Sequence, residues 1–288
     1  GLGDVYKRQF SIEENTSKSI FKNADLLKNI ATERVISEFL KLICGKDAVK
    51  ILDAYRETIA VIIPEITVMF NFNQNNIHHS YDLWQHTLTA LGTIEPNSIL
   101  RMTMLLHDIG KPSVKTTDNS GQSHFQGHQL ESKKIADRIL HRLRLPSDFI
   151  NKTLLLIEYH DVRFNGSKKL MKKVMNVLGT DLTKQLLEVE YADISAQSEY
   201  QREEKLGYLE TAKTHFNEII KDNECFKLSQ LDINGKDVLN LGVKEGRDVG
   251  NILDYLLMLV VDANVPNKKS ILISKAKEYI CLLYTSPS

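Results

Sequence analysis

Apolar side chains recur every three to four residues along most of the chain, which is the spacing of an amphipathic helix. Stripes of this kind run from Val35 to Ile43, Ile99 to Leu106, Ile135 to Leu143, Leu182 to Val189 and Ile252 to Val260. No segment alternates between apolar and polar residues for long enough to predict a buried strand. The pattern therefore predicts an all-α fold, a multi-helix bundle.

Polar residues and proline mark the expected ends of several helices. Thr32 precedes the first stripe and Asn97 or Ser98 precedes the second, where a side-chain oxygen can accept the first free amide hydrogens of a helix. Pro146 is expected to end one helix, and Ser147 to cap the next one, which should run to about residue 159. The polar segment 111–126 is predicted to be a long loop.

The chain divides into three predicted regions. Residues 10–70 form a first helical unit, residues 77–200 a second, and residues 201–280 a third. The second region holds eight of the nine histidines. We therefore expect the chemistry of the chain to lie there.

Composition excludes several classes of protein. The 288 residues include 42% hydrophobic residues and three cysteines, which fits neither a disordered, nor a collagenous, nor a disulfide-rich chain. Apolar runs such as Tyr255–Val261 are too short to span a bilayer, so no membrane association is expected. With isolated cysteines and no visible signal peptide, we expect a cytoplasmic protein. The 37 basic and 37 acidic residues balance, so any attraction for RNA must be local.

The two ends of the chain are related at the DNA level. DNA that can encode Gly1–Gln9, read as its reverse complement in another frame, can encode Cys281–Ser288. Such DNA resembles a transposon adapter used in sequencing libraries, so we predict that residues 1–9 and 281–288 are adapter-derived and not biological. Phe10–Ile280 would then be the biological part, with Cys44 and Cys225 as isolated thiols.

Histidines and aspartates of the second region form an ordered series near predicted helix ends. Imidazole nitrogens and carboxylate oxygens suit a divalent transition metal, and packed helices can bring such side chains to one point. Because Asp108 directly follows His107, it could bridge two ions while its neighbour binds one. The predicted metal ligands are His86, His107, Asp108, His128, His160 and Asp193.

The order His86, His107-Asp108, Asp193, with LLHDIGK intact, resembles the HD-domain superfamily of metal-dependent phosphohydrolases. In that resemblance His128 and His160 fall where members with two ions supply further ligands. Each histidine taken singly also fits a surface or core residue with local hydrogen bonds. We expect Asp161 to orient a ligand, His124 to face the loop or the substrate, and four histidines to be surface residues: His78, His79, His141 and His215.

The ligand set predicts a hydrolase for phosphomonoesters or phosphodiesters, with one or two ions of Mg, Mn, Ni or Fe. A bound divalent ion lowers the pKa of its water and polarises a phosphoryl oxygen. We expect Asp108, Lys111 and His128 to act in catalysis. Lys111 follows Asp108 by three residues and could pair with a substrate phosphate, although a solvated loop lysine fits as well.

A second resemblance spans residues 10–280. LLKNIATERVISEFLKLI at 26–43, LLHDIGKPSVKTTD at 105–118 and LDINGKDVLNLGVKEGRDVGNILDYLLMLVV at 231–261 resemble the neck, HD region and tail of bacterial CCA-adding tRNA nucleotidyltransferases. That family adds and repairs tRNA 3′ ends with a head that contains an Asp-x-Asp pair. No two aspartates have that spacing here, so we expect a fragment that lacks the head and does not add nucleotides by itself.

Basic residues cluster at helical spacing in two places. Such faces can follow an RNA backbone, although an ordinary solvated helix face has the same pattern. With the resemblance to a tRNA enzyme, we expect tRNA as a partner. The predicted RNA-binding residues are Lys133, Lys134, Arg138, Arg142, Lys172 and Lys173.

Two other functions remain open from the sequence. One is a stand-alone HD phosphohydrolase acting on nucleotides, against which the neck-like and tail-like segments argue. The other is a non-catalytic tRNA-binding module with a vestigial HD site, against which the complete ligand set argues. A poly(A)-type polymerase parent is a further alternative.

Overall fold

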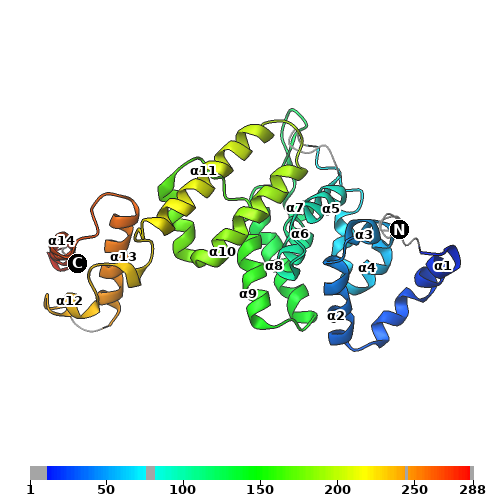
Figure 1. Cartoon of the computed structure of the whole chain (residues 1–288), viewed down its shortest axis with the longest axis horizontal. Helices are drawn as coiled ribbons and strands as arrows, with labels where there is room; N and C mark the ends of the chain where they lie inside the picture. Colours follow the sequence, from blue (N-terminus) through cyan, green and yellow to red (C-terminus); the bar gives the residue numbers. More distant parts are fainter. Residues whose placement is uncertain (1–11, 76–81, 244–245, 286–288) are drawn as a thin grey trace, which may run out of the picture. The chain divides into compact units, whose positions relative to one another are not determined.

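Helices form nearly all of the structure, which confirms the all-α prediction (Figure 1). The computed structural model describes residues 12–75, 82–243 and 246–285. The predicted adapter segment 1–9 lies outside these residues. The other one, 281–288, continues the last helix as far as residue 285. The first elements are α1 (Glu14–Asn23), η2 (Ala24–Asn29), α2 (Thr32–Ile43), α3 (Ala48–Ala54), α4 (Arg56–Ile62) and η3 (Pro64–Met69).

The remaining elements follow in two groups along the chain. The middle group is α5 (Leu83–Thr93), α6 (Ser98–Leu106), α7 (Lys111–Val114), β1 (Thr116–Thr117), β2 (Ser123–His124), α8 (His128–Arg142) and α9 (Ser147–Tyr159). The last group is α10 (Lys168–Ala196), α11 (Arg202–Lys221), η4 (Leu228–Gln230), α12 (Gly235–Leu239), α13 (Arg247–Val261) and α14 (Lys269–Thr285). In the described ranges, no helix combines the length and apolarity that a bilayer crossing requires.

The chain folds into two compact units, and each unit is built from two separate segments of the sequence. The first unit holds residues 1–161 and 188–202, and the second holds 162–187 and 203–288. Helix α10 contributes to both, and its backbone leaves helical geometry at Gly179, where φ is 71°. A positive φ favours glycine, which has no Cβ to clash. The predicted region 10–70 and most of the predicted region 77–200 lie in the first unit. The division into three regions stays a prediction.

Helix α6 lies at the centre of the first unit. Every residue from Leu100 to Leu106 is buried, and the helix packs against α2, α5 and α9. A helix that is buried on all sides lies in the interior of its unit, even though Arg101 and Thr103 are among its residues. The turn that follows α6, with His107 and Asp108, is therefore inside the unit.

The helix ends agree with only part of the sequence prediction. Asn97 is confirmed as a cap, because its Oδ1 accepts hydrogen bonds from the amides of Ile99 and Leu100 at 2.9 and 3.3 Å. The caps at Thr32 and Ser147 are wrong by one residue. The extended residue before each helix is Ala31 or Pro146, with ψ of 130° and 144°, so both hydroxyl residues are already helical.

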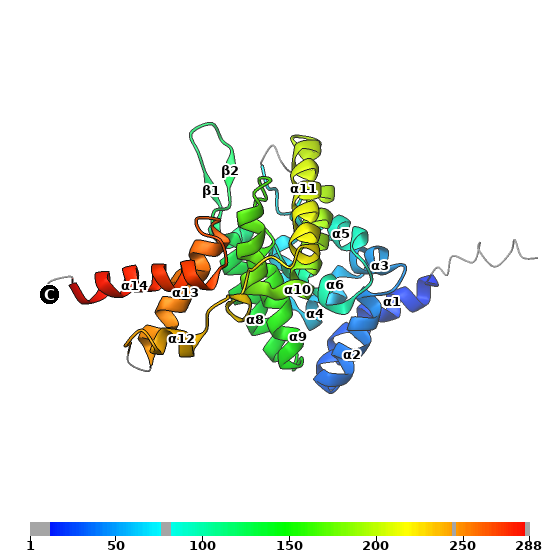
Figure 2. The same ribbon diagram turned by 60° about the vertical axis from the view of Figure 1, so that its left-hand side comes forward.

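The predicted loop 111–126 is more ordered than expected. Its first residues form α7, and its centre is an antiparallel hairpin that pairs Thr116 with His124. Asp118 closes the turn, since its Oδ1 accepts hydrogen bonds from the amides of Ser120 and Gln122 at 2.9 and 3.0 Å. Figure 2 shows this hairpin as a narrow projection. The sequence did not reveal it because each strand has only two residues, too few for alternation to appear.

The second unit has its own apolar core. The facing sides of α12, α13 and α14 bury a cluster that includes Val238, Ile252, Leu256, Leu272 and Ala276. The stripe predicted over residues 252–260 supplies three of its members, Ile252, Leu256 and Val260. This cluster explains why the C-terminal helices fold together.

Gly110 marks the closest backbone approach beside the predicted site. A Cβ at this position would lie 2.5 Å from the amide nitrogen of Ser132 and 2.8 Å from the carbonyl oxygen of His128. The amide of Gly110 also donates to Ser132 Oγ at 2.9 Å. Glycine therefore lets the turn after α6 lie directly on the first turns of α8.

We expect Gly110→Ala to lower the free energy of unfolding by at least about 1–3 kcal/mol, the usual cost of overpacking. The measurement is urea denaturation of the full chain. Gly207→Ala is the matched control, because it lies in the exposed part of α11 and nothing is within 4 Å of the position that its added methyl group would take. That control should be neutral or stabilising by up to about 1 kcal/mol. Equal stability of the two variants would contradict the close approach.

Candidate metal centre

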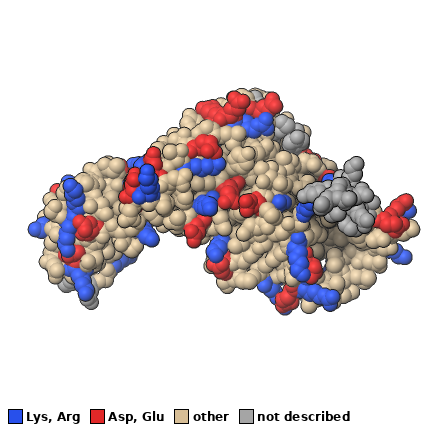
Figure 3. All heavy atoms as spheres, viewed as in Figure 1, with Lys and Arg blue, Asp and Glu red and all other residues tan. Residues whose placement is uncertain are grey.

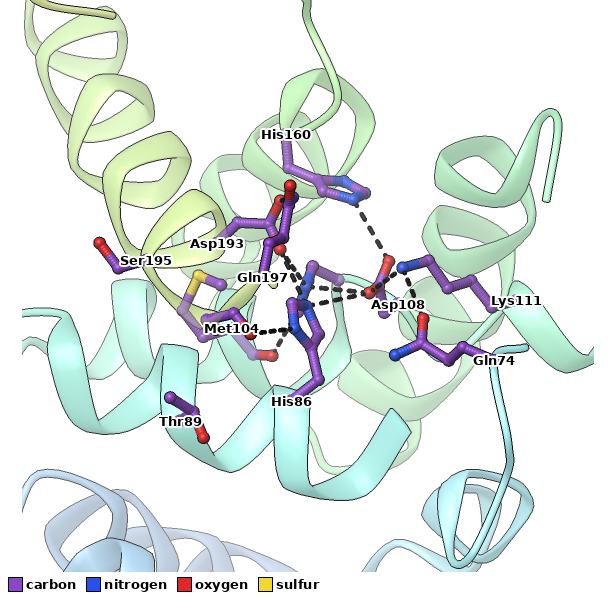
Figure 4. A network of polar contacts seen from close by, with 12 residues as sticks. Gln74, His86, Thr89, Met104, Asp108, Lys111, His160, Asp193, Ser195 and Gln197 are labelled. Carbon is purple, nitrogen blue, oxygen red and sulfur yellow. Dashed lines mark hydrogen bonds and ion pairs between the residues drawn. The ribbon is translucent and has the colours of Figure 1, made fainter. Parts of the chain in front are cut away.

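The structure brings all six predicted metal ligands together in the first unit. Figure 4 labels His86, Asp108, His160 and Asp193 among them. They come from different helices: α5 supplies His86, and the last turns of α10 supply Asp193. His107 and His160 each follow the last residue of a helix, and His128 is the first residue of α8. Helix ends place these side chains where the packed helices meet.

The six side chains form two groups that share one residue. We call His86, His107, Asp108 and Asp193 the four-ligand group, and Asp108, His128 and His160 the three-ligand group. Within each group, one ligand atom from every residue lies within 4.8 Å of the others. This separation fits a metal ion at the centre of each group.

Asp108 faces the two groups with different oxygens. Its Oδ2 lies 3.4 Å from His86 Nε2 and 3.2 Å from His107 Nε2. Its Oδ1 lies 3.2 Å from His128 Nε2 and 3.5 Å from His160 Nε2. Asp193 completes the four-ligand group, with Oδ1 at 2.9 Å from His86 Nε2. Asp108 is thus placed to bridge two ions.

All four histidines turn the same nitrogen toward the centre. In each ring Nδ1 lies against a backbone carbonyl oxygen, and Nε2 points at the carboxylates. A ring that donates from Nδ1 keeps the Nε2 lone pair free, which is the arrangement that orients metal-binding histidines. The Nδ1 partners are Ala196 for His86 at 3.3 Å, Met104 for His107 at 2.7 Å, Phe125 for His128 at 2.9 Å and Ile157 for His160 at 2.6 Å.

The centre has acceptors that call for a cation. His128 Nε2 and His160 Nε2 lie 3.1 Å apart, so two lone pairs would face each other unless a proton or an ion lies between them. Both oxygens of Asp108 and the Nε2 of His107 are buried. Lys111 Nζ lies 2.6 Å from Asp108 Oδ2, while the Nε2 atoms of His128 and His160 lie 3.2 and 3.5 Å from Oδ1. A buried acceptor without a donor is costly, and a divalent ion would satisfy such acceptors.

Charge at the centre shifts the pKa of its members. Burial favours neutral His107, but Asp108 and Asp193 outweigh it and raise the His107 pKa to about 10. Burial likewise opposes the charged form of His86, whose pKa is nevertheless raised by the same two carboxylates. Burial favours protonated carboxyls, yet the cationic neighbours His107 and Lys111 hold the pKa of Asp108 well below its usual range. Asp193 is shifted the same way beside His107 and His86. The raised pKa favours a proton on His107, at a nitrogen that a metal would otherwise take.

Lys111 is buried beside the ligands, unlike a solvated loop lysine. Its Nζ lies 2.6 Å from Asp108 Oδ2 and donates to Gln74 Oε1 at 3.1 Å. The ammonium group also lies 5.6 Å from the centre of the Phe125 ring, a cation–π contact. The interpretation as a solvated loop lysine is therefore wrong, because α7 begins at Lys111 and turns it inward.

Residues outside the predicted set hold the ligands in place. Gln197 Nε2 donates to Asp193 Oδ2 at 2.8 Å, which leaves Oδ1 for His86 and His107. Gln197 lies four residues after Asp193, a spacing from which its contact with Asp193 could have been predicted. The contact of Gln74 with Lys111 could not be predicted in this way, because the two residues are 37 positions apart. Asp161, expected to orient a ligand, is exposed. The Ile157 carbonyl orients His160 instead.

The other histidines lie away from the ligand groups. His124 is exposed and contacts Asp118 Oδ2 at 2.8 Å in the hairpin. His141 is exposed, as predicted, while His215 is half-buried against the Gly166 carbonyl, so its expected surface position is only partly correct. His78 and His79 lie outside the described residues.

Most residues predicted to bind RNA face acidic side chains of their own unit. Arg138 is exposed on α8 and forms no ion pair within the described ranges. Basic and acidic side chains lie side by side on the face shown in Figure 3. The pairs are Lys133 with Glu158 at 2.6 Å, Lys134 with Glu131 at 3.2 Å, Arg142 with Glu65 at 2.6 Å, Lys172 with Glu224 at 2.6 Å and Lys173 with Asp262 at 3.2 Å.

Two family models match the chain. Residues 128–276 match the model described as "tRNA nucleotidyltransferase domain 2 putative", and residues 9–70 match "Probable RNA and SrmB- binding site of polymerase A". The first match covers more than half of the chain and includes His128, His160 and Asp193. The match to the RNA-binding model ends at residue 70, where the first predicted region, 10–70, also ends.

Curated relatives are similar over much of the chain. The CC-adding tRNA nucleotidyltransferase of Thermus thermophilus is 28% identical over 277 residues, covering 90% of this chain and 61% of the relative. The A-adding enzyme of Deinococcus radiodurans is 29% identical over 54% of the chain and 38% of its own length. The multifunctional CCA protein of Legionella pneumophila is 27% identical over 51% of the chain. The chain thus spans at most 61% of these relatives.

We expect Gln197→Leu to weaken Mn²⁺ binding by about 10-fold, because Asp193 loses the hydrogen bond that directs Oδ1 at the centre. Isothermal titration of the metal-free full chain with Mn²⁺ measures this change. Gln185→Leu, at a half-buried position of α10, is the matched control and should bind like the unchanged protein. Equal affinities for both variants would show that Gln197 does not position Asp193.

Proposed function

Because this chain belongs to the family of tRNA nucleotidyltransferase domain 2, we propose that it is the neck, HD and tail part of a tRNA nucleotidyltransferase and carries a metal-dependent phosphohydrolase site. The substrate class is a phosphomonoester or phosphodiester. One observation carries the hydrolase: two ligand groups share the buried carboxylate of Asp108. Addition of nucleotides is assigned to the longer relatives and not to these residues.

The donor set fits divalent ions of the Mn, Fe or Ni kind, with Mg as a weaker match. Four imidazoles and two carboxylates provide nitrogen and oxygen ligands, which favour borderline transition metals. A bound ion would supply a water of lowered pKa and polarise the phosphoryl group. His86, His107 and Asp193 would hold one ion, His128 and His160 a second, and Asp108 would bridge them.

The chain's own residues fix the orientation of the ligands and place a positive charge beside them. Backbone carbonyls fix the four imidazoles with Nε2 inward, so ligand geometry is set before any substrate arrives. Lys111 keeps a positive charge at Asp108 Oδ2, where it would attract a phosphate oxygen as a point charge. Asp108 would hold both ions, and His128, whose side chain is 9% exposed, would face a bound substrate.

We expect Asp108→Asn to abolish metal-dependent hydrolysis of bis-p-nitrophenyl phosphate and p-nitrophenyl phosphate, since both ligand groups lose their shared carboxylate. The assay adds Mn²⁺, Ni²⁺ or Mg²⁺ to the chelator-treated full chain and follows release of nitrophenol. His141→Ala removes an exposed histidine and serves as the control with full activity. Hydrolysis that survives Asp108→Asn, or that does not need metal, would refute the proposed site.

A tRNA-binding role is the second proposed function, supported by the match of residues 9–70 to an RNA-binding family. The relatives are named for tRNA, so tRNA is the partner we propose. Ion pairing leaves few free basic side chains on α8, and Arg138 is one of them. Binding should therefore be weak and sensitive to salt, because each phosphate contact releases counterions.

We expect Arg138→Ala to reduce tRNA affinity and its salt dependence while leaving stability unchanged. Arg142→Ala should instead lower the free energy of unfolding by up to about 1 kcal/mol, because it breaks a partly exposed pair with Glu65. Filter binding at several salt concentrations and urea denaturation measure the two effects. Affinity that does not change with salt would contradict the proposed RNA contact.

A further inference from the structure

We propose that the three-ligand group takes up its divalent ion only together with a phosphate anion, whereas the four-ligand group holds an ion alone. This inference rests on the proposed hydrolase function and deepens it. The phosphate group of the substrate would then complete the centre that acts on it. The ligand count and the charge of the two groups support it.

The two groups offer different numbers of donors. The four-ligand group provides two imidazole nitrogens and two carboxylate oxygens, so four donors would come from the chain itself. The three-ligand group provides two imidazole nitrogens and only the Oδ1 of Asp108. Sites with three protein ligands keep a position open for water or substrate. An ion in the three-ligand group therefore needs a ligand from outside the chain.

The net charge of the centre also favours one bound ion over two. With neutral metal-bound imidazoles, Asp108 and Asp193 contribute two negative charges and Lys111 one positive charge, a net of −1. One divalent ion makes the net charge +1, and a second makes it +3. So much uncompensated charge in a buried site is strongly unfavourable. A phosphate with about two negative charges returns the net to about +1.

The positive charge of Lys111 is held firmly at the centre. Its side chain is 7% exposed, lies 2.6 Å from Asp108 Oδ2 and contacts Gln74 and Phe125. Lys111 thus contacts the Asp108 oxygen that faces the four-ligand group. Its charge adds to that of any ion bound at the centre, and it attracts an incoming anion.

Each group has one partly exposed ligand. The side chains of Asp193 in the four-ligand group and His128 in the three-ligand group are 14% and 9% exposed, while the other four ligands are 2% exposed or less. Exposure is therefore similar in the two groups, and the number of ligands and the charge distinguish them.

The test counts Mn²⁺ ions bound to the chelator-treated full chain by equilibrium dialysis, with and without inorganic phosphate at equal ionic strength. We expect one tightly bound ion without phosphate and two with it, with at least about a tenfold gain in affinity for the second. The double variant His128→Ala, His160→Ala should keep the first ion and lose the phosphate-dependent one. His124→Ala, His141→Ala removes two exposed histidines and is the matched control.

Lys111→Met tests the charge argument separately. Removal of one positive charge should let the second ion bind without phosphate, and thermal unfolding confirms that the variant is folded. Two ions of equal affinity without phosphate in the unchanged chain, unchanged ion counts in Lys111→Met, or phosphate-dependent uptake in the His128, His160 variant would each overturn the proposal. Expected ion counts without any ester hydrolysis would instead contradict only the hydrolase.

Discussion

The buried carboxylate of Asp108 is the group on which the candidate centre depends. A charged carboxylate inside a protein is stable only when cationic or donor groups surround it. Here four imidazoles and the ammonium group of Lys111 do so, and Lys111 also needs Gln74 and Phe125. One side chain thus contacts residues from the helices α5, α7 and α8 and from the turns that follow α6 and α9. The helix packing around α6 brings these elements close enough for this to happen.

The backbone has as large a part in the centre as the ligands do. Each imidazole is anchored through Nδ1 to a carbonyl, and in three of the four cases that carbonyl lies three residues earlier. A local anchor of this kind keeps the ring orientation independent of distant packing. The close contact at Gly110 then sets the distance between the turn after α6 and the start of α8. For these three histidines orientation is local, whereas His86 is oriented by the distant carbonyl of Ala196.

Much of this arrangement was readable from the sequence. Helical spacing predicted the all-α fold, and the ordered histidines and aspartates predicted side chains that the structure brings together. The partners of Lys111 and Arg142 were not readable, because Gln74 and Glu65 are 37 and 77 residues away. Sequence patterns report periodicity and neighbours, whereas ion pairs between distant elements depend on how helices pack. For the same reason, runs of basic residues that looked free for RNA are mostly paired.

The discontinuity of the first unit has a consequence for how the protein is made. Asp193 reaches the centre only after the chain has left that unit at residue 162 and returned at residue 188. During synthesis the growing chain therefore holds five of the six ligands well before the last one appears. A nascent chain that ends before residue 193 has only an incomplete four-ligand group. Maturation of the centre must await this excursion, which ties the assembly of the first unit to the folding of the second.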